Sequence, residues 1–142
     1  MTTVSSLLSR KNLLPVIVAP DAAVVDTLKL MAEKNIGSAI VMEGDKYLGI
    51  VTERDYSRKV ILKGKNSAIT KVSEIMSTDL PTAKPGDTIE HCMEMMTSRN
   101  IRYMPVFENS KLVGIVSMSD VVKETILAQK ETIEQLHSYI QS

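Results

Sequence analysis

Two short phrases of the sequence carry the same chemically useful side chains at the same spacing. They read Gly49-Ile-Val-Thr-Glu-Arg-Asp55 and Gly114-Ile-Val-Ser-Met-Ser-Asp120, and they lie 65 residues apart. In each, a hydroxyl stands three positions before a carboxylate, where an apolar stretch gives way to a helical pattern. A hydroxyl beside the free N–H groups of a helix N-terminus can bind a phosphate, and a carboxylate one turn further can accept two hydrogen bonds from a ribose diol. Phosphate and diol together describe a nucleotide.

The same four residues also fit a purely structural role. Ser or Thr before a helix, followed three residues later by an acidic side chain, forms a capping box, in which Asp is a shorter substitute for the usual Glu. Thr52 with Asp55 and Ser117 with Asp120 therefore predict either two capped helices or two nucleotide sites. A binding measurement separates these hypotheses.

Other nucleotide-binding signatures are missing. The sequence has no Gly-x-x-x-x-Gly-Lys-Ser/Thr loop and no Gly-x-Gly-x-x-Gly after a strand, so phosphate-loop hydrolysis and dinucleotide oxidoreduction are not supported. Gly49 and Gly114 each precede the hydroxyl by three positions. We expect the absence of a Cβ there to let a ligand approach the backbone closely.

The two phrases belong to a longer duplication. The same offset pairs Pro20 with Pro85, Met31 with Met96, Asn35 with Asn100 and Val41 with Val106, without a gap. One copy of about 65 residues would be marginally stable alone. The sequence therefore predicts two related units, 1–70 with a linker and 71–142 with an extended C-terminal helix.

Hydrophobic patterns predict the order strand, helix, strand, strand, helix in both copies, which is a mixed α/β fold. In the first copy the expected strands are 16–18, 36–42 and 47–52, and the helices are 22–34, with Asp21 as N-cap, and 53–62. In the second copy the expected strands are 82–84, 103–108 and 112–117, and the helices are 88–99 and 119–140.

The last helix is longer than its counterpart and has a coiled-coil pattern. Its apolar residues follow alternating steps of three and four, at Val122, Ile126, Ile133, Leu136 and Ile140, with Gln129 as an interruption. This pattern of two to three heptads predicts either a contact between chains or packing on the chain's own body.

Charge and composition exclude several function classes. The 17 basic and 17 acidic residues cancel, so no overall field favours a nucleic acid. The segment 54–71 is an exception, with six basic residues and Asp55 as its single acid, and it is either a solvated face or an attraction for phosphate. No apolar run is long enough for a membrane helix and the start lacks a secretory pattern, so a soluble cytoplasmic protein is expected.

Cys92 is the single cysteine, which excludes an internal disulfide and a cysteine-clustered zinc site. His91 precedes it, but neighbouring helix positions point about 100° apart. We therefore expect one solvent-facing and one core-facing residue rather than a nucleophile and its base.

With these motifs in order in both halves, and with Ile101-Arg-Tyr-Met-Pro-Val106 before the second phrase, the chain resembles a tandem pair of cystathionine-β-synthase-type (CBS) domains, or Bateman module, over about residues 4–128. The resemblance implies two β-α-β-β-α units packed sheet to sheet with pseudo-two-fold symmetry. It implies two clefts that bind adenosine-containing effectors, such as AMP, ADP, ATP, NAD or S-adenosylmethionine. It also implies a disc-like homodimer that senses ligands and has no catalytic or metal residues.

The resemblance also implies the cleft residues. The first cleft would contain Thr52, Arg54 and Asp55, with Ile101 and Arg102 from the opposite copy; the second would contain Ser117, Ser119 and Asp120, with Ile36 and Gly37. Arg102 can bind phosphate and Gly37 cannot. Because the basic segment also lies on the Asp55 side, we expect that cleft to take the tighter or more phosphorylated ligand.

Three function classes remain open. The first is a regulatory sensor whose adenosine-containing ligand changes a homodimer and so the activity of an unknown protein partner. The second is a constitutive dimerisation or adaptor protein with empty clefts, in which Thr52 and Ser117 only cap helices. The third, an enzyme acting on a nucleotide, lacks a visible nucleophile–base pair or metal cluster. With no effector domain in the sequence, we expect action through another protein or through self-association.

Overall fold

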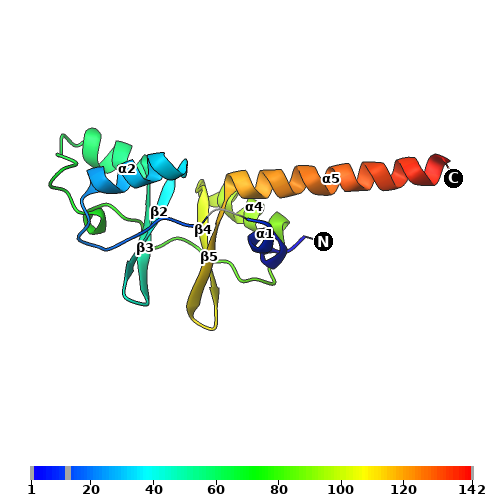
Figure 1. Ribbon diagram of the computed structural model, residues 1–142, viewed down its shortest axis with the longest axis horizontal. Coiled ribbons are helices and arrows are strands. Elements are labelled where there is room, and N and C mark those ends of the chain that lie inside the picture. The colour runs from blue at the N-terminus through cyan, green and yellow to red at the C-terminus, as the bar shows by residue number, and fades with distance from the viewer. Residues whose placement is uncertain (1, 12–13, 142) are drawn as a thin grey trace. The chain divides into compact units, whose positions relative to one another are not determined.

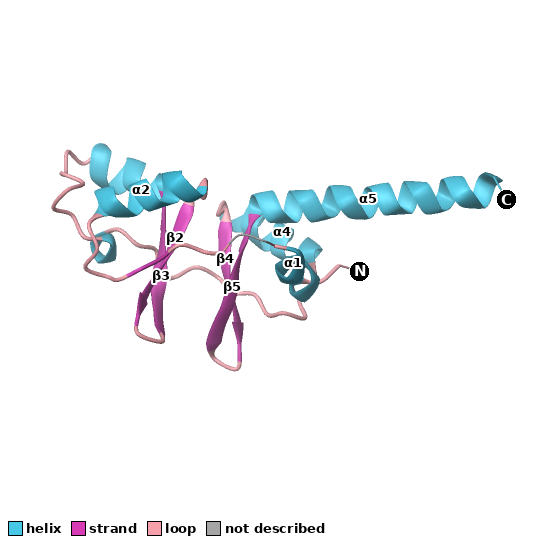
Figure 2. Cartoon of the chain, in the orientation of Figure 1, coloured by secondary structure: helices cyan, strands magenta, loops and turns pink. Residues whose placement is uncertain are grey.

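The computed structural model describes residues 2–11 and 14–141 and confirms the predicted mixed α/β fold. Figure 1 shows the elements along the chain, and Figure 2 shows their types. The chain forms two compact units: unit 1 comprises Met1–Asn12 and Pro81–Ser142, and unit 2 comprises Leu13–Leu80. Each unit contains one small sheet with helices. The sheet-to-sheet packing and the pseudo-two-fold symmetry implied by the resemblance stay predictions.

The compact units do not coincide with the sequence repeats, 1–70 and 71–142, because the repeats are defined by similarity and the units by contact. The first helix, α1 (Val4–Arg10), belongs to unit 1. The N–H groups of Val4 and Ser5 donate to the carbonyl oxygens of Asp87 and Pro85, at 2.8 and 2.9 Å. Val4 is also fully buried in the core of unit 1. The N-terminal segment therefore completes the unit of the second repeat.

Unit 2 is built on a three-stranded sheet in the order β1-β2-β3. Its elements are β1 (Ile17–Val18), α2 (Val24–Lys34), β2 (Ser38–Glu43), β3 (Lys46–Thr52), α3 (Glu53–Tyr56), a π-helical continuation η1 (Ser57–Ile61) and a 3-10 turn η2 (Val72–Glu74). β1 is parallel to β2, which is antiparallel to β3. The core contains residues from the sheet and α2, among them Val24, Met31, Val41 and Val51.

The predicted N-cap of α2 is wrong. The cap is Ala23, which has an extended backbone and makes no side-chain capping hydrogen bond. Ala23 stays extended because it forms an antiparallel bridge with Lys71, while Asp21 lies in the preceding turn. The expected helix 53–62 is present as α3 and η1, and it ends before Gly64, whose φ of +68° suits glycine.

In its described residues, 2–11 and 81–141, unit 1 contains a two-stranded sheet and three helices. Besides α1, its elements are α4 (Ile89–Arg99), β4 (Tyr103–Glu108), β5 (Lys111–Ser117) and α5 (Met118–Gln141). The expected strand 82–84 is reduced to one parallel bridge between Ala83 and Val106. Pro85 limits this pairing because proline has no N–H to donate. Thr88 caps α4 by accepting a hydrogen bond from the N–H of His91 at 3.1 Å.

The two β-hairpins repeat each other in detail, which confirms the duplication at the level of the backbone. In both, the first strand pairs its first residue with the hydroxyl residue of the phrase, Ser38 with Thr52 and Tyr103 with Ser117. Both have a register shift at equivalent places, Val41/Met42 and Val106/Phe107. Both hairpins therefore deliver a hydroxyl to the start of the next helix.

Gly49 and Gly114 accommodate the chain itself, so the expectation that they open space for a ligand is wrong. A Cβ on Gly49 would lie 2.7 Å from the carbonyl oxygen of Ser77, and one on Gly114 would lie 2.9 Å from Cδ2 of Leu8. The first neighbour is backbone and the second is the end of a flexible side chain. Each glycine is therefore needed for packing within its own unit.

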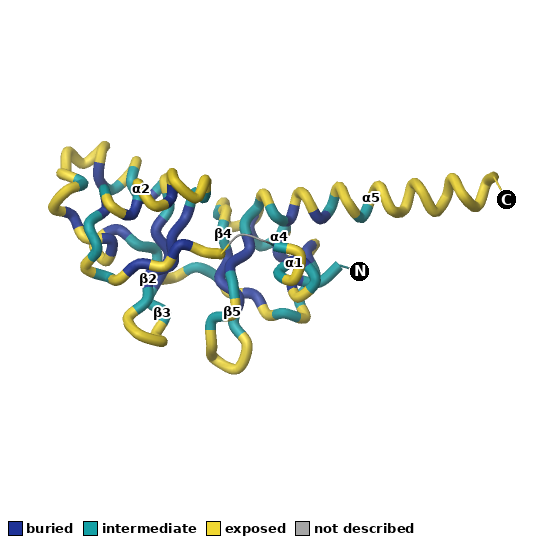
Figure 3. Tube along the Cα trace, viewed as in Figure 1, coloured by how far each residue is buried: buried dark blue, intermediate teal, exposed yellow. Residues whose placement is uncertain are grey.

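No residue of the outer part of α5 is among the described core residues of unit 1. Every residue from 129 to 141 is exposed, as the yellow end of α5 in Figure 3 shows. For these residues, packing of the apolar seam on the rest of unit 1 is not observed. Among the described residues, no helix combines the length and apolar character needed to span a membrane.

The two glycines lead to a testable difference. We expect Gly49→Ala to lower the free energy of unfolding by about 1–3 kcal/mol, the usual cost of overpacking. Gly114→Ala should cost less, because Leu8 can rotate whereas the Ser77 carbonyl is held by the backbone. Urea unfolding would measure both, with Gly86→Ala as the control, since nothing lies within 4 Å of a Cβ there. Equal losses of unfolding free energy in Gly49→Ala and Gly114→Ala would contradict the predicted difference between the two sites.

Candidate functional site

The carboxylate of Asp55 closes a complete capping box at the start of α3. Thr52 is the N-cap, and its hydroxyl oxygen accepts the N–H of Asp55 at 3.1 Å. In return, Oδ2 of Asp55 accepts the N–H of Thr52 at 2.9 Å and its hydroxyl at 3.0 Å. Asp55 is 7% exposed. The structural role predicted for this pair is therefore present.

The second oxygen of Asp55 is held by a cation and a hydroxyl. Oδ1 lies 3.0 Å from Nζ of Lys59 and accepts the hydroxyl of Ser77 at 3.3 Å. Nζ of Lys59 also donates to the carbonyl of Ile75 at 2.8 Å. Both oxygens of this buried carboxylate thus have partners within unit 2, as a buried charge requires.

Asp120 makes the equivalent arrangement in the first turn of α5. The N–H of Ser117 donates to Oδ2 of Asp120, and the N–H of Asp120 donates to the hydroxyl of Ser117, both at 3.0 Å. Its cation is Lys11, whose Nζ donates to the same Oδ2 at 2.8 Å and to the carbonyl of Ile115 at 3.0 Å. A hydroxyl, a carboxylate and a lysine therefore meet at the strand-to-helix junction in both units.

The electrostatics of Asp120 favour the ionised form. Burial raises the pKa of Asp120, but the hydrogen bonds from Lys11 and Ser117 and the charge of Lys11 outweigh it, so that the pKa is lowered. The site therefore holds a carboxylate that can accept hydrogen bonds at neutral pH.

Both lysines were missed as site residues. Lys59 was counted only as part of the basic segment, although it stands four positions after Asp55, a spacing that brings side chains together on a helical turn. Lys11 lies 109 positions from Asp120, and no spacing in the sequence signals it. Positive charge therefore reaches both carboxylates, not the Asp55 side alone.

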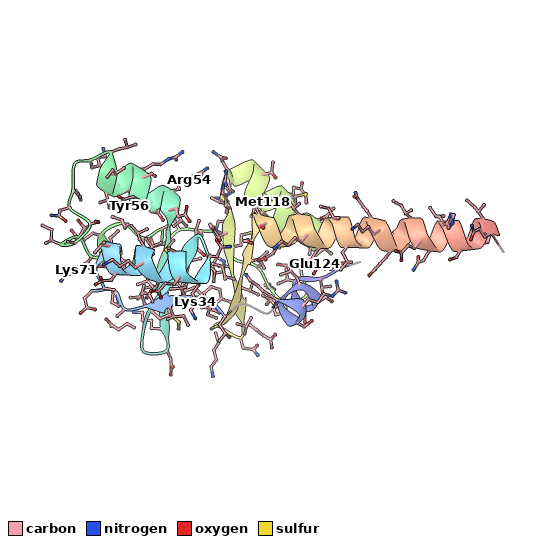
Figure 4. All side chains as sticks on the ribbon, turned by 45° about the horizontal axis from the view of Figure 1, so that its top comes forward. Lys34, Arg54, Tyr56, Lys71, Met118 and Glu124 are labelled. Carbon is pink, nitrogen blue, oxygen red and sulfur yellow. The ribbon has the colours of Figure 1, made fainter. Side chains whose placement is uncertain are left out.

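The structure brings some of the predicted cleft residues together within a unit. The N–H of Glu53 donates to the carbonyl of Gly37 at 3.3 Å, so Gly37 lies at the Thr52 end of unit 2. The N–H of Met118 donates to the carbonyl of Arg102 at 2.8 Å in unit 1. Thr52, Arg54 and Asp55 are together at the start of α3, where Figure 4 labels Arg54, and Ser117, Ser119 and Asp120 are together at the start of α5.

The pairings that join the two copies stay predictions. These are Ile101 and Arg102 with Asp55, and Ile36 and Gly37 with Asp120. The preference of the Asp55 side for a more phosphorylated ligand depends on them and stays a prediction as well.

Cys92 and His91 have the different environments that the sequence predicts, since Cys92 is buried in α4 and His91 is exposed. Burial, with a smaller contribution from Asp87, raises the pKa of Cys92 to about 11. The thiol is therefore protonated at neutral pH and is a poor nucleophile. Within the part of the chain that the structure describes, no group of three or more His, Cys, Asp or Glu residues could hold a metal ion.

The repeated junctions agree with the comparison to known proteins. A sequence model of the CBS domain matches residues 4–61 and again residues 72–126. The chain belongs to the CBS domain family. It contains a tandem pair of these domains, which is a regulatory module.

Several CBS domain proteins resemble this one over most of its length. It is 37% identical over 126 residues to the CBS domain-containing protein CBSX3, mitochondrial, of Arabidopsis thaliana, and the match covers 85% of this chain and 61% of that protein. A solved structure of a protein with CBS domains from Burkholderia ambifaria is 41% identical, covers 90% of this chain and 96% of its own, and has a TM-score of 0.85.

A third protein shares the fold at lower identity. It is the CBS domain pair of MJ0100, solved in complex with 5′-methylthioadenosine and S-adenosyl-L-methionine. That pair is 24% identical, with a TM-score of 0.75, and the match covers 87% of this chain and 99% of that one. At this identity the likeness shows the fold alone.

The lowered pKa of Asp120 gives stability a defined dependence on pH. The ionised carboxylate contributes stability above the pKa of an unfolded aspartate, about 3.9, and this contribution is lost as the pH falls through the lower folded pKa. We expect Asp120→Asn to lower the free energy of unfolding by about 1–2 kcal/mol at pH 7. Urea unfolding should show this deficit narrowing below about pH 4.

The control is Asp45→Asn, in the exposed turn between β2 and β3. It should leave the free energy of unfolding unchanged both at pH 7 and at pH 3. A deficit for Asp120→Asn that stays constant from pH 7 to pH 3 would show that the charge of Asp120 is not stabilising.

Proposed function

We propose that this CBS pair is a sensor that binds adenosine-containing nucleotides at sites built on Asp55 and Asp120, and passes the ligand state to a protein partner through a homodimer, without catalysis. The observation that carries the proposal is the hydroxyl, carboxylate and lysine at the strand-to-helix junction of both units. A hydroxyl at a helix start can bind a phosphate, and a carboxylate can bind a ribose diol. A lysine can pair either with the carboxylate or with the phosphate.

A nucleotide would bind by exchange with the lysine. Lys59 and Lys11 hold Asp55 and Asp120 at 3.0 and 2.8 Å. A ribose diol that donates to the carboxylate takes over this role, and the displaced ammonium stays beside the ligand, where it can pair with a phosphate. Each lysine is thus a competitor of the ribose and a partner of the phosphate.

The family arrangement would complete each site with residues of the other copy. Arg102 would then add a second cation to the Asp55 site, whereas Gly37 would add none to the Asp120 site. With Lys59 and Arg102 on one side and Lys11 on the other, the Asp55 site would take the more phosphorylated ligand. The compounds bound by the MJ0100 pair, 5′-methylthioadenosine and S-adenosyl-L-methionine, also contain adenosine.

An adaptor with empty clefts is the second candidate. It is favoured by the complete capping boxes, in which both oxygens of Asp55 and Oδ2 of Asp120 have partners without any ligand. In that case the four residues serve only to start α3 and α5. An enzyme is the third candidate, and turnover of a bound nucleotide over hours would support it.

A thermal-shift screen separates the sensor from the adaptor. We expect at least one of AMP, ADP, ATP, NAD and S-adenosylmethionine to stabilise the protein, by about 2.7 kcal/mol at 100 times its dissociation constant. Calorimetry on Asp55→Ala and Asp120→Ala should then show one site lost in each, with the tighter site lost in Asp55→Ala. No shift with any of the five compounds would favour the adaptor.

The exchange at Asp120 predicts different effects of one substitution on the affinities for two ligands. Lys11→Met removes the competitor, so adenosine, which has a diol and no phosphate, should bind the Asp120 site more tightly than in the wild type. AMP should gain less or bind more weakly, because its phosphate loses a cation. Calorimetry in the Asp55→Ala background isolates this site.

Lys84→Met is the control, because Lys84 is an exposed lysine of the same unit. It should change the affinity for neither ligand. Equal losses for adenosine and AMP in Lys11→Met would contradict the exchange.

A further inference from the structure

The outer half of α5 exposes a row of large apolar side chains. Ile133, Leu136 and Ile140 are 65%, 57% and 80% exposed, and no residue from 129 to 141 is buried. An isolated helical segment this short is marginally stable in water. Covering exposed aliphatic side chains with another surface lowers the free energy, because apolar area is removed from water. The sequence of α5 indicates what that surface is.

The apolar row defines a heptad register. The a positions are Ile126, Ile133 and Ile140, and the d positions are Val122, Gln129 and Leu136. In parallel coiled coils, a β-branched residue at a with leucine at d favours two strands. All three a positions fit this rule, and Leu136 fits it among the d positions, so the row is suited to pairing with a helix of the same sequence.

The flanking positions favour a parallel pair over an antiparallel one. The e positions are Lys123, Lys130 and His137, and the g positions are Thr125, Thr132 and Tyr139. In an antiparallel pair e faces e, which brings Lys130 against its own copy. In a parallel pair e faces g, so Lys130 lies beside Thr125 of the second chain. Only the parallel arrangement avoids contact between like charges.

Gln129 favours identical chains in register. Its amide has both donors and an acceptor, so two copies of Gln129 that meet in one layer can hydrogen-bond to each other. In a shifted or antiparallel pair the amide would face isoleucine or leucine and would lack a partner, which costs about 1–3 kcal/mol. A single polar residue at a core position commonly fixes register in this way.

We infer that α5 pairs with α5 of a second copy of this chain as a parallel, in-register, two-stranded coiled coil from Val122 to Ile140, with the two Gln129 side chains in one central layer. The inference deepens the homodimer of the proposed function and rests on it. It does not depend on nucleotide binding, because the seam contains none of the site residues.

Cysteine cross-linking tests the pairing in the full-length chain. Leu136→Cys, in a Cys92→Ser background, places one thiol at a d position. In the parallel pair the two thiols face each other, and mild oxidation should give a covalent dimer. In an antiparallel pair centred between Gln129 and Ile133 they would lie about 15 Å apart along the axis and would not cross-link. Gln135→Cys, on the outer face, is the matched control and should stay monomeric on denaturing gels.

A second set of variants tests whether the seam holds the pair. Ile133→Glu with Ile140→Glu should abolish the Leu136→Cys cross-link, whereas Gln135→Glu with Ser138→Glu adds the same charge to the outer face and should leave the cross-link intact. Circular dichroism would confirm that the rest of the chain stays folded. Loss of the cross-link in both sets, or in neither, would overturn the inference.

The outcomes for the seam and for the proposed function can be told apart. A cross-link without nucleotide binding supports the coiled coil and removes the sensor. Nucleotide binding without a cross-link removes the coiled coil and leaves the sensor. A chain that is monomeric by light scattering and forms no cross-link, but whose α5 binds a different protein, would also overturn the pairing with a second copy.

Discussion

A carboxylate held at the start of a helix, buried in Asp55 and half-buried in Asp120, is the constraint on which both units depend. Asp55 is almost fully buried, so its charge must be met by several donors at once. The donors are the N–H and hydroxyl of Thr52, the hydroxyl of Ser77 and the ammonium of Lys59. Together they fix where β3 ends and α3 begins. The same groups are the ones proposed to bind a nucleotide, so in that proposal stability and binding depend on one set of hydrogen bonds.

The two units take the lysine that pairs with the carboxylate from different parts of the chain. Asp55 takes its lysine from the following turn of helix, whereas Asp120 takes Lys11 from the N-terminal segment. Next to it, Arg10 lies 2.7 Å from the buried Glu124, which Figure 4 labels on α5. Two adjacent ion pairs therefore attach the start of the chain to its last helix. This is why the first helix belongs to the unit of the second repeat, and why a ligand at Asp120 would compete with a contact that holds the unit together.

The sequence could reveal features that depend on local spacing. The capping boxes, both hairpins, the two long helices and the coiled-coil row of α5 are set by residues a few positions apart, and the structure has them where the patterns predict. Features set by distant contacts were missed. Lys11 binds Asp120 although the two lie 109 positions apart in the sequence. The side chain of Leu8 fills the space beside Gly114, and the bridge to Lys71 keeps Ala23 extended. Each of these needs the folded unit before the contact exists.

The helix that carries the Asp120 site also carries the proposed pairing seam. Asp120 lies in the first turn of α5, and Val122, the first d position, follows two residues later. A rigid helix transmits a change at one end to the other, so a ligand that altered how Asp120 is held would act on the proposed helix pair. It can do so only by binding the paired and unpaired states with different affinity. In the proposed exchange at Asp120, Lys11 would be released from α5 while the Arg10–Glu124 pair remains, so the start of α5 would be held differently in the ligand-bound chain.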